Sequence, residues 1–155
     1  FGSDVSFGAT APTTTVFTGG RAGEGNMNFE SGNQVVAYCF ASVDGFSKIG
    51  AYVGNSSTDG TYVYTGFRPA FLIIKNIQTT DNWFMFDSVR SPYNEVNGFL
   101  KPNTDEIEFA FGNGGIDILA NGFKIRGNST LSNGHNQTHI YLAFAKQPFK
   151  YANAG

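Results

Sequence analysis

Cysteine is almost absent from this chain, since Cys39 is the only one among 155 residues. A single cysteine excludes an intrachain disulfide framework, and it also excludes a zinc site built from several cysteines. Cys39 lies in the apolar run 35–41, where a small apolar residue is more often packed than reactive. We therefore expect the Cys39 side chain to be buried and inert.

Charge is also scarce. Charged residues make up 14% of the chain and the net charge is −2, whereas roughly a quarter of the residues are charged in an ordinary soluble domain. The Lys and Arg residues are spread along the sequence, so we expect no basic patch and no nucleic-acid partner. No apolar run approaches the roughly 18 residues of a membrane span, so we expect no membrane insertion.

Short runs of β-branched and aromatic residues fill the chain after Gly32, and they predict strands. We expect these strands at about 34–43, 47–53, 61–66, 70–77, 82–88, 106–111, 115–120, 122–127 and 138–145. Turn dipeptides separate many of them: Asp44-Gly45, Asp59-Gly60, Asn97-Gly98, Asn113-Gly114, Asn121-Gly122 and Asn133-Gly134. This pattern predicts an all-β fold, an antiparallel β-sandwich of jelly-roll type, with an open barrel as the alternative.

The first 33 residues differ in composition from the rest. They are rich in Gly, Ser and Thr and contribute little to a core by themselves. We therefore divide the chain into an extended arm or linker at 1–33 and a β-sandwich domain at 34–155. The arm could connect to a shaft or exchange a strand with a neighbouring copy.

Catalytic groups are hard to find in the sequence. The only histidines are His135 and His139, and their flanking residues predict a loop that enters a strand, where both are polar loop residues and no helical metal pair forms. The acidic residues serve turns or a solvated strand edge, as Glu106 and Glu108 do, and no pair stands out as an acid and a base. We expect no enzyme and no catalytic residue.

Two sets of oxygen-bearing side chains could hold calcium. Neither has EF-hand spacing, so we expect no cofactor and no metal ligands, with calcium as the alternative. The sets are Asp81, Asn82 and Asp87, and Asn103, Asp105 and Glu106.

Aromatic residues beside polar loops fit recognition better than catalysis. Tyrosine rings next to Asn and Asp side chains are common equipment for binding sugars or protein surfaces. The candidate ligand-binding residues are Tyr62, Tyr64 and Tyr93.

Two motifs occur in the middle of the chain. Residues 64–76 read YTGFRPAFLIIKN, with a Gly-Phe-x-Pro turn before an apolar strand, and residues 81–90 read DNWFMFDSVR. We assign structural roles to four motif residues: Pro69 fixes the entry to the strand, Trp83 supplies core volume, and Asp87 pairs with Arg90 to lock a strand end.

These motifs, the hairpin at 118–125 and the closing segment 141–153 resemble a family of virion surface proteins of tailed bacteriophages, notably marine ones, over about residues 34–153. The resemblance implies a structural role in a tail-fibre-like component, and the family brings no catalytic residues with it.

The resemblance leads us to expect a virion surface module on a tail fibre or similar appendage. We expect it to be assembled in the host cytoplasm, to pack with other virion proteins and with copies of itself as a homo-oligomer, and to contact host surface glycans. The alternatives are a capsid decoration or head-fibre protein, a free carbohydrate-binding module and, third, a glycan-degrading enzyme.

Overall fold

The structure is a computed structural model that describes residues 13–17, 36–110, 112 and 115–148. The chain divides by its contacts into two compact units, residues 1–39 and 40–155. In the first unit, Thr13 donates its backbone N–H to the carbonyl of Val16 and so closes a short turn. The rest of the predicted arm lies outside the described residues.

The second unit holds the strands and one short helix. In chain order these are β1 (Ser47–Val53), β2 (Tyr62–Tyr64), β3 (Pro69–Asn76), β4 (Phe84–Asp87), β5 (Gly98–Phe99), β6 (Phe109–Ala110), β7 (Ile116–Leu119), β8 (Gly122–Ile125), α1 (Thr130–Asn133) and β9 (Thr138–Ala145).

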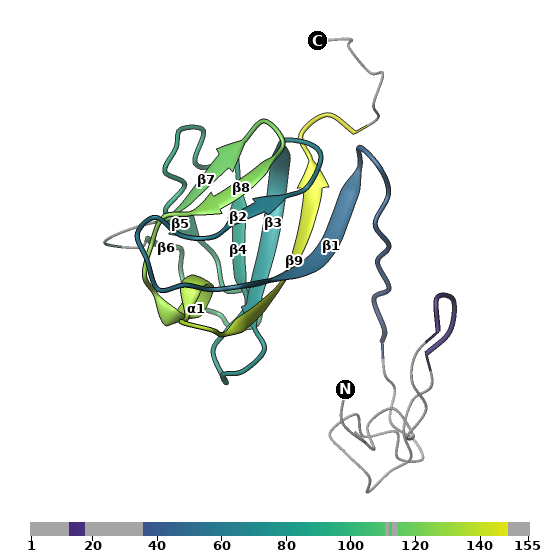
Figure 1. The fold of residues 1–155 in the computed structure, drawn as a ribbon, viewed down its shortest axis with the longest axis horizontal. Helices are drawn as coiled ribbons and strands as arrows, with labels where there is room; N and C mark the ends of the chain where they lie inside the picture. Colours follow the sequence, from purple (N-terminus) through teal and green to yellow (C-terminus); the bar gives the residue numbers. More distant parts are fainter. Residues whose placement is uncertain (1–12, 18–35, 111, 113–114, 149–155) are drawn as a thin grey trace, which may run out of the picture. The chain divides into compact units, whose positions relative to one another are not determined.

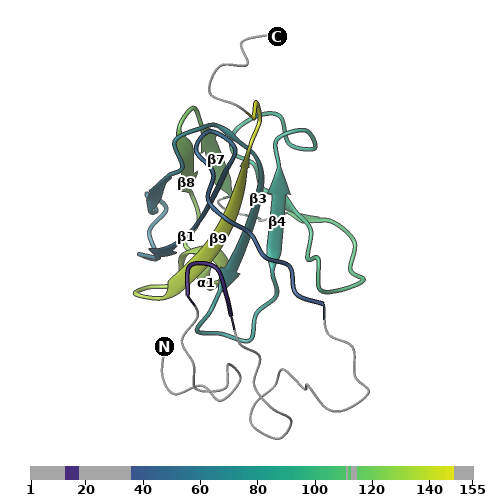
Figure 2. The same ribbon diagram turned by 90° about the vertical axis from the view of Figure 1, so that its right-hand side faces the viewer.

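Two antiparallel sheets form the body of this unit. The larger sheet has the order β1-β9-β3-β4, and the smaller one has the order β2-β8-β7. Figure 1 shows the four strands of the larger sheet side by side, with β9 in yellow. Figure 2, turned by 90°, separates β7 and β8 from β3 and β4 as two layers. The prediction of an all-β, antiparallel sandwich is therefore confirmed.

The core lies between the two layers because side chains alternate across each strand. Leu72 and Ile74 of β3 are completely buried, as are Phe123 and Ile125 of β8. The ring of Tyr141 on β9 lies 5.3 Å from that of Phe123 in an edge-on contact, so aromatic side chains join the two sheets.

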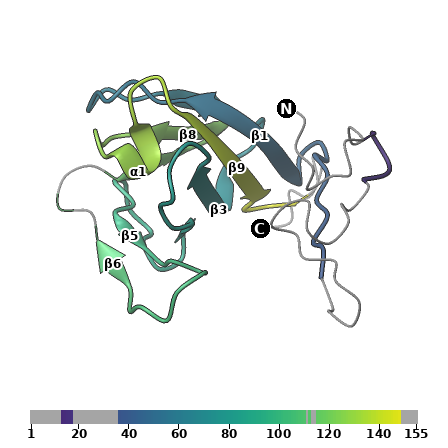
Figure 3. The same cartoon turned by 90° about the horizontal axis from the view of Figure 1, so that it is seen from below.

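Residues 96–100 close one side of the sandwich. Val96 forms a bridge with Ile116 of β7, and Leu100 forms one with Met85 of β4, so this segment passes from the edge of the smaller sheet to the edge of the larger one. Phe99 between them packs 5.2 Å from Phe84. The small β5–β6 pair lies to one side of the domain (Figure 3).

Two sequence predictions fail at the start of the sandwich. Residues 36–42 lie in no strand, and Val43 makes only an isolated bridge with Ser47, so the strand predicted at 34–43 is absent from its described part. Cys39 is exposed, not buried. Both errors have the same cause, since none of the described strands covers residues 36–41.

Candidate functional site

Two exposed tyrosines lie on the outer face of β2. Tyr62 and Tyr64 are 43% and 63% exposed, while Val63 between them is buried. Residues two apart on a strand share a face and are roughly 7 Å apart, so the two rings form one aromatic surface. The hydroxyl of Tyr62 donates to Oδ1 of Asn121, at 2.9 Å, and this bond ties the ring to the turn between β7 and β8. We call Tyr62, Tyr64, Asn121 and Lys124 the tyrosine face.

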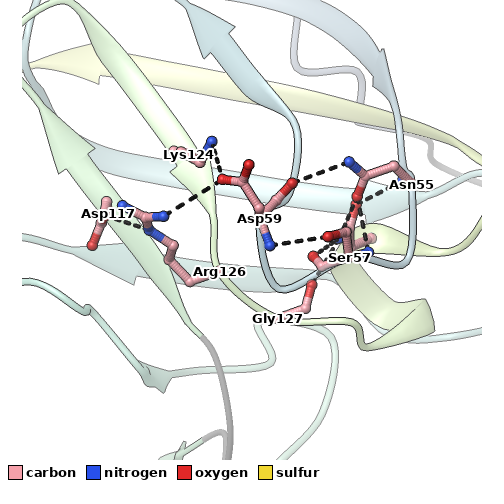
Figure 4. Close-up of polar contacts among 8 residues, drawn as sticks. Asn55, Ser57, Asp59, Asp117, Lys124, Arg126 and Gly127 are labelled. Carbon is pink, nitrogen blue, oxygen red and sulfur yellow. Dashed lines mark hydrogen bonds and ion pairs between the residues drawn. The ribbon is translucent and has the colours of Figure 1, made fainter.

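Charged side chains continue the tyrosine face along one row of the sheet. Tyr62 is paired with Lys124 of β8, which is paired with Asp117 of β7. Lys124 Nζ lies 2.6 Å from Asp59 Oδ1, and Arg126 Nε lies 2.6 Å from Asp117 Oδ2 (Figure 4). The hydrogen bond from Lys124 lowers the pKa of Asp59, and the hydrogen bond to Asp117 raises the pKa of Arg126. The row therefore presents paired charges of both signs beside the aromatic rings.

A buried asparagine holds the loop that carries Asp59. Asn133 is completely buried at the end of α1. Its Nδ2 donates to the carbonyls of Ser57 at 2.9 Å and Gly127 at 2.8 Å, while its Oδ1 accepts from the backbone N–H of Asn55 at 2.9 Å. Asn133 therefore fixes the loop 54–60 against the chain that follows β8. In the sequence, Asn133 was noted only as the first residue of the turn dipeptide Asn133-Gly134, and no pattern indicated that its side chain is buried.

The third predicted ligand-binding residue is separate from this face. Tyr93 is 84% exposed and lies in the connection after β4. Its neighbour Asn94 exchanges hydrogen bonds with the backbone of Ile118 in β7, which is separated from β2 by β8. The structure thus brings Tyr62 and Tyr64 together and places Tyr93 elsewhere.

The predicted structural residues have mixed outcomes. Pro69 is buried and begins β3, and Asp87 forms the predicted ion pair with Arg90, which also reaches Glu108 at 3.3 Å. Trp83 does not supply core volume, because it is only half-buried and precedes β4. The alternation of β4 directs Phe84 and Phe86 into the core instead.

The histidines lie in different surroundings. His135 is exposed in a turn. His139 is completely buried on β9 and stacks on Tyr52 at 5.0 Å, so the prediction of a polar loop residue is wrong for it. Burial lowers the pKa of His139, and its Nδ1 lies 3.0 Å from the carbonyl oxygen of Gln137. This histidine is part of the folded interior.

The side chains of the predicted calcium sets make contacts within the protein. Asp81 accepts a hydrogen bond from Thr79 at 2.6 Å, Asn82 accepts one from Asn103 at 2.7 Å, and Glu106 pairs with Lys101 at 2.5 Å. Within the residues that the structure describes, no three His, Cys, Asp or Glu side chains gather into a metal-binding group. The expectation of no metal stays a prediction, with calcium as its alternative.

A second surface covers the outside of the larger sheet. The register places Ile49, Leu142, Ile73 and Met85 in one row across all four strands. These outward side chains are half-buried, and the bridge to Leu100 extends the row by one residue. We call this surface the apolar face, and it comprises Ile49, Phe71, Ile73, Met85, Ile140, Leu142 and Phe144.

Charge is confined to the ends of the apolar face. The outward residues of the four strands all belong to the part of the chain that the structure describes. Among them, only Lys75 and Asp87 are charged. Lys75 Nζ donates to the carbonyl of Thr79 at 2.9 Å, and Asp87 pairs with Arg90, so both charges have partners in the same chain. At the Asp87 end, the ring of Phe144 lies 6.0 to 6.2 Å from other phenylalanine rings, those of Phe40, Phe46 and Phe71.

A family model described as a domain of unknown function, DUF7483, matches residues 2–148. The chain belongs to the DUF7483 family. No curated protein and no solved structure matches it.

The two surfaces of this DUF7483 domain suit different partners. The tyrosine face offers ring surfaces together with amide and charged groups, which can stack on a sugar and hydrogen-bond its hydroxyls. The apolar face offers methyl and phenyl groups, which need an apolar partner. No helix among the described residues is long and apolar enough to cross a membrane.

Proposed function

We propose that this domain is a structural surface module of a tailed-phage virion, carried on a tail fibre or a similar appendage, that assembles with copies of itself. The apolar face carries this proposal. Its seven side chains are only half-buried, and apolar surface that stays partly open to water often marks an interaction site. Sheet faces covered with apolar side chains are stable when a second layer covers them.

The tyrosine face is the proposed contact with host surface glycans. It lies on the smaller sheet, on the opposite side of the sandwich from the apolar face, so packing of copies through the apolar face leaves Tyr62 and Tyr64 accessible. The proposal requires no catalytic step, since assembly and sugar binding both rest on noncovalent contacts.

A free carbohydrate-binding module is the second candidate, and the tyrosine face favours it. Such a module would bind sugar as a monomer and would be absent from particles. The capsid decoration or head-fibre alternative shares the assembly surface and differs only in its location on the particle.

Antibody labelling of purified phage particles in the electron microscope tests the proposed function. We expect an antibody raised against this chain to label the tail appendage. Label on the capsid shell would support the decoration alternative. Particles that carry no label and contain no peptide from this chain would overturn the virion role.

A further inference from the structure

The segment before β1 has the sequence pattern of a strand and no place in a sheet. Val36, Tyr38 and Phe40 alternate with smaller residues, which predicts one apolar side. Residues 36–42 nevertheless lie outside every strand that the structure describes. The three side chains are 73%, 82% and 55% exposed, so the segment leaves apolar surface in water. Such exposed apolar surface is a candidate contact for another chain.

The residues directly after this segment are fixed at the edge of the larger sheet. Val43 and Ser47 exchange backbone hydrogen bonds of 2.9 Å, and the hydroxyl of Ser42 accepts from the N–H of Ile49 at 3.0 Å. The ring of Phe40 lies 6.0 Å from that of Phe144. The segment therefore starts at one corner of the apolar face.

The apolar face and the segment match in polarity. The central row of the face, from Ile49 to Met85, has no charged residue, and residues 36–42 have none either. Contact between two uncharged, apolar surfaces removes both from water and leaves no ion unpaired. A charged or glycan partner would instead have to strip its own polar groups of water on this face.

We propose that residues 36–40 of one copy lie in extended form on the apolar face of a second copy. Phe40 keeps its contact with Phe144 of its own chain, while Val36 and Tyr38 pack on Ile73 and Leu142 of the neighbour. The proposal rests on the self-assembly in the proposed function and names the surfaces that make the contact. A second copy is the occupant because it supplies the same exposed segment at the same corner, so each contact can be repeated around a closed assembly.

Disulfide trapping between two differently labelled chains tests this contact. Both chains carry Cys39→Ser, one also carries Tyr38→Cys, and the other carries Ile73→Cys. After mixing and mild oxidation, we expect a covalent dimer on a non-reducing gel and a peptide joining positions 38 and 73 in the mass spectrum. The control chain carries Cys39→Ser with Tyr64→Cys, which places the second cysteine on the tyrosine face.

The outcomes of this experiment separate three cases. The proposal is supported if position 38 cross-links to position 73 more than it cross-links to position 64. Equal linkage at both positions overturns it. A single chain that carries both Tyr38→Cys and Ile73→Cys gives the third case. If this chain forms only a disulfide within itself, the proposal is overturned, because the segment then covers the apolar face of its own chain.

A second measurement keeps the inference distinct from the proposed function. Val36→Ser with Tyr38→Ser removes two exposed apolar groups that the isolated chain does not pack, so the fold should be unchanged. We expect self-association to weaken at least roughly 100-fold, since both groups leave the interface. An oligomer that this pair of substitutions leaves unchanged would refute the segment contact, whereas the assembly and the virion role would stand.

Discussion

Asn133 and Asn55 exchange two hydrogen bonds although they are 78 residues apart in the sequence. Asn133 Oδ1 accepts from the backbone N–H of Asn55 at 2.9 Å, and Asn133 Nδ2 donates to Asn55 Oδ1 at 3.0 Å. The pair joins the loop after β1 to the end of α1. Because Asp59 lies on this loop and pairs with Lys124, the same bonds position one edge of the tyrosine face.

Replacing Asn133 tests the importance of this junction. Asn133→Ala leaves the carbonyls of Ser57 and Gly127 and the N–H of Asn55 without their side-chain partner. We expect the free energy of unfolding to fall by about 3 kcal/mol, because unpaired buried polar groups cost about 1 to 3 kcal/mol each. Urea unfolding followed by circular dichroism measures the change. Asn128→Ala, at an exposed position, is the control, and equal small losses in both variants would contradict this account.

The close approach of two loops makes a second stability prediction. A Cβ atom on Gly54 would lie 2.3 Å from the carbonyl oxygen of Gly134, whereas one on Gly112 would meet nothing within 4 Å. We expect Gly54→Ala to destabilise the domain by about 2 kcal/mol, because the backbone must move to accept the methyl group. Gly112→Ala should change stability by less than about 0.5 kcal/mol. Thermal unfolding of both variants compares them directly, and similar melting temperatures would be the contrary result.

His139 predicts a pH dependence of stability. Burial lowers its pKa in the folded state, so the unfolded chain binds more protons than the folded one between that lowered pKa and about 6.5. Stability therefore rises with pH through this window, and the contribution is lost as the pH falls below about 6.5.

Unfolding at a series of pH values, in wild type and variants, measures this slope. We expect His139→Gln to flatten the slope below about pH 6.5, whereas His135→Gln, which replaces an exposed side chain, should preserve it. A slope that survives His139→Gln would assign the pH dependence to another group.

The tyrosine face predicts a loss of sugar binding in a domain that stays folded. Tyr62→Ala with Tyr64→Ala removes both exposed rings, and we expect affinity for host surface polysaccharide to fall at least roughly 10-fold, since each ring contact contributes about 0.5 to 1.5 kcal/mol. Tyr93→Ala removes an exposed ring outside the face and should leave binding unchanged. Glycan arrays with the three proteins measure this, and binding that depends on Tyr93 alone would move the site to the connection after β4.

The sequence predicted the strands best where alternation and turns agree. The ranges predicted at 47–53 and 138–145 coincide with β1 and β9, and in β9 buried and partly exposed residues alternate from Thr138 to Phe144. The two-residue β5 and the four-residue α1 were missed, because such short elements have no periodicity to detect. Ser129, whose side chain accepts from the N–H of Leu131 as the helix N-cap, was the one local signal for α1.

The candidate sites depended on contacts that a sequence pattern does not contain. Tyr62 and Tyr64 share a face because they are two apart on one strand, and the sequence could predict this much. The charged row beside them needs the pairing of β2 with β8 and of β8 with β7, which only the fold provides. The apolar face could not be predicted from the sequence either, because its rows combine single residues from four strands.

The molar mass of the chain in solution tests the central claim most directly. We predict that light scattering after size-exclusion chromatography gives a multiple of 16.7 kDa for wild type at about 100 μM, a range in which even weak interfaces associate. Ile73→Glu, which places a charge in the middle of the apolar face, should give the mass of one folded chain. A wild-type mass of 16.7 kDa at every concentration would contradict the assembly of copies through the apolar face.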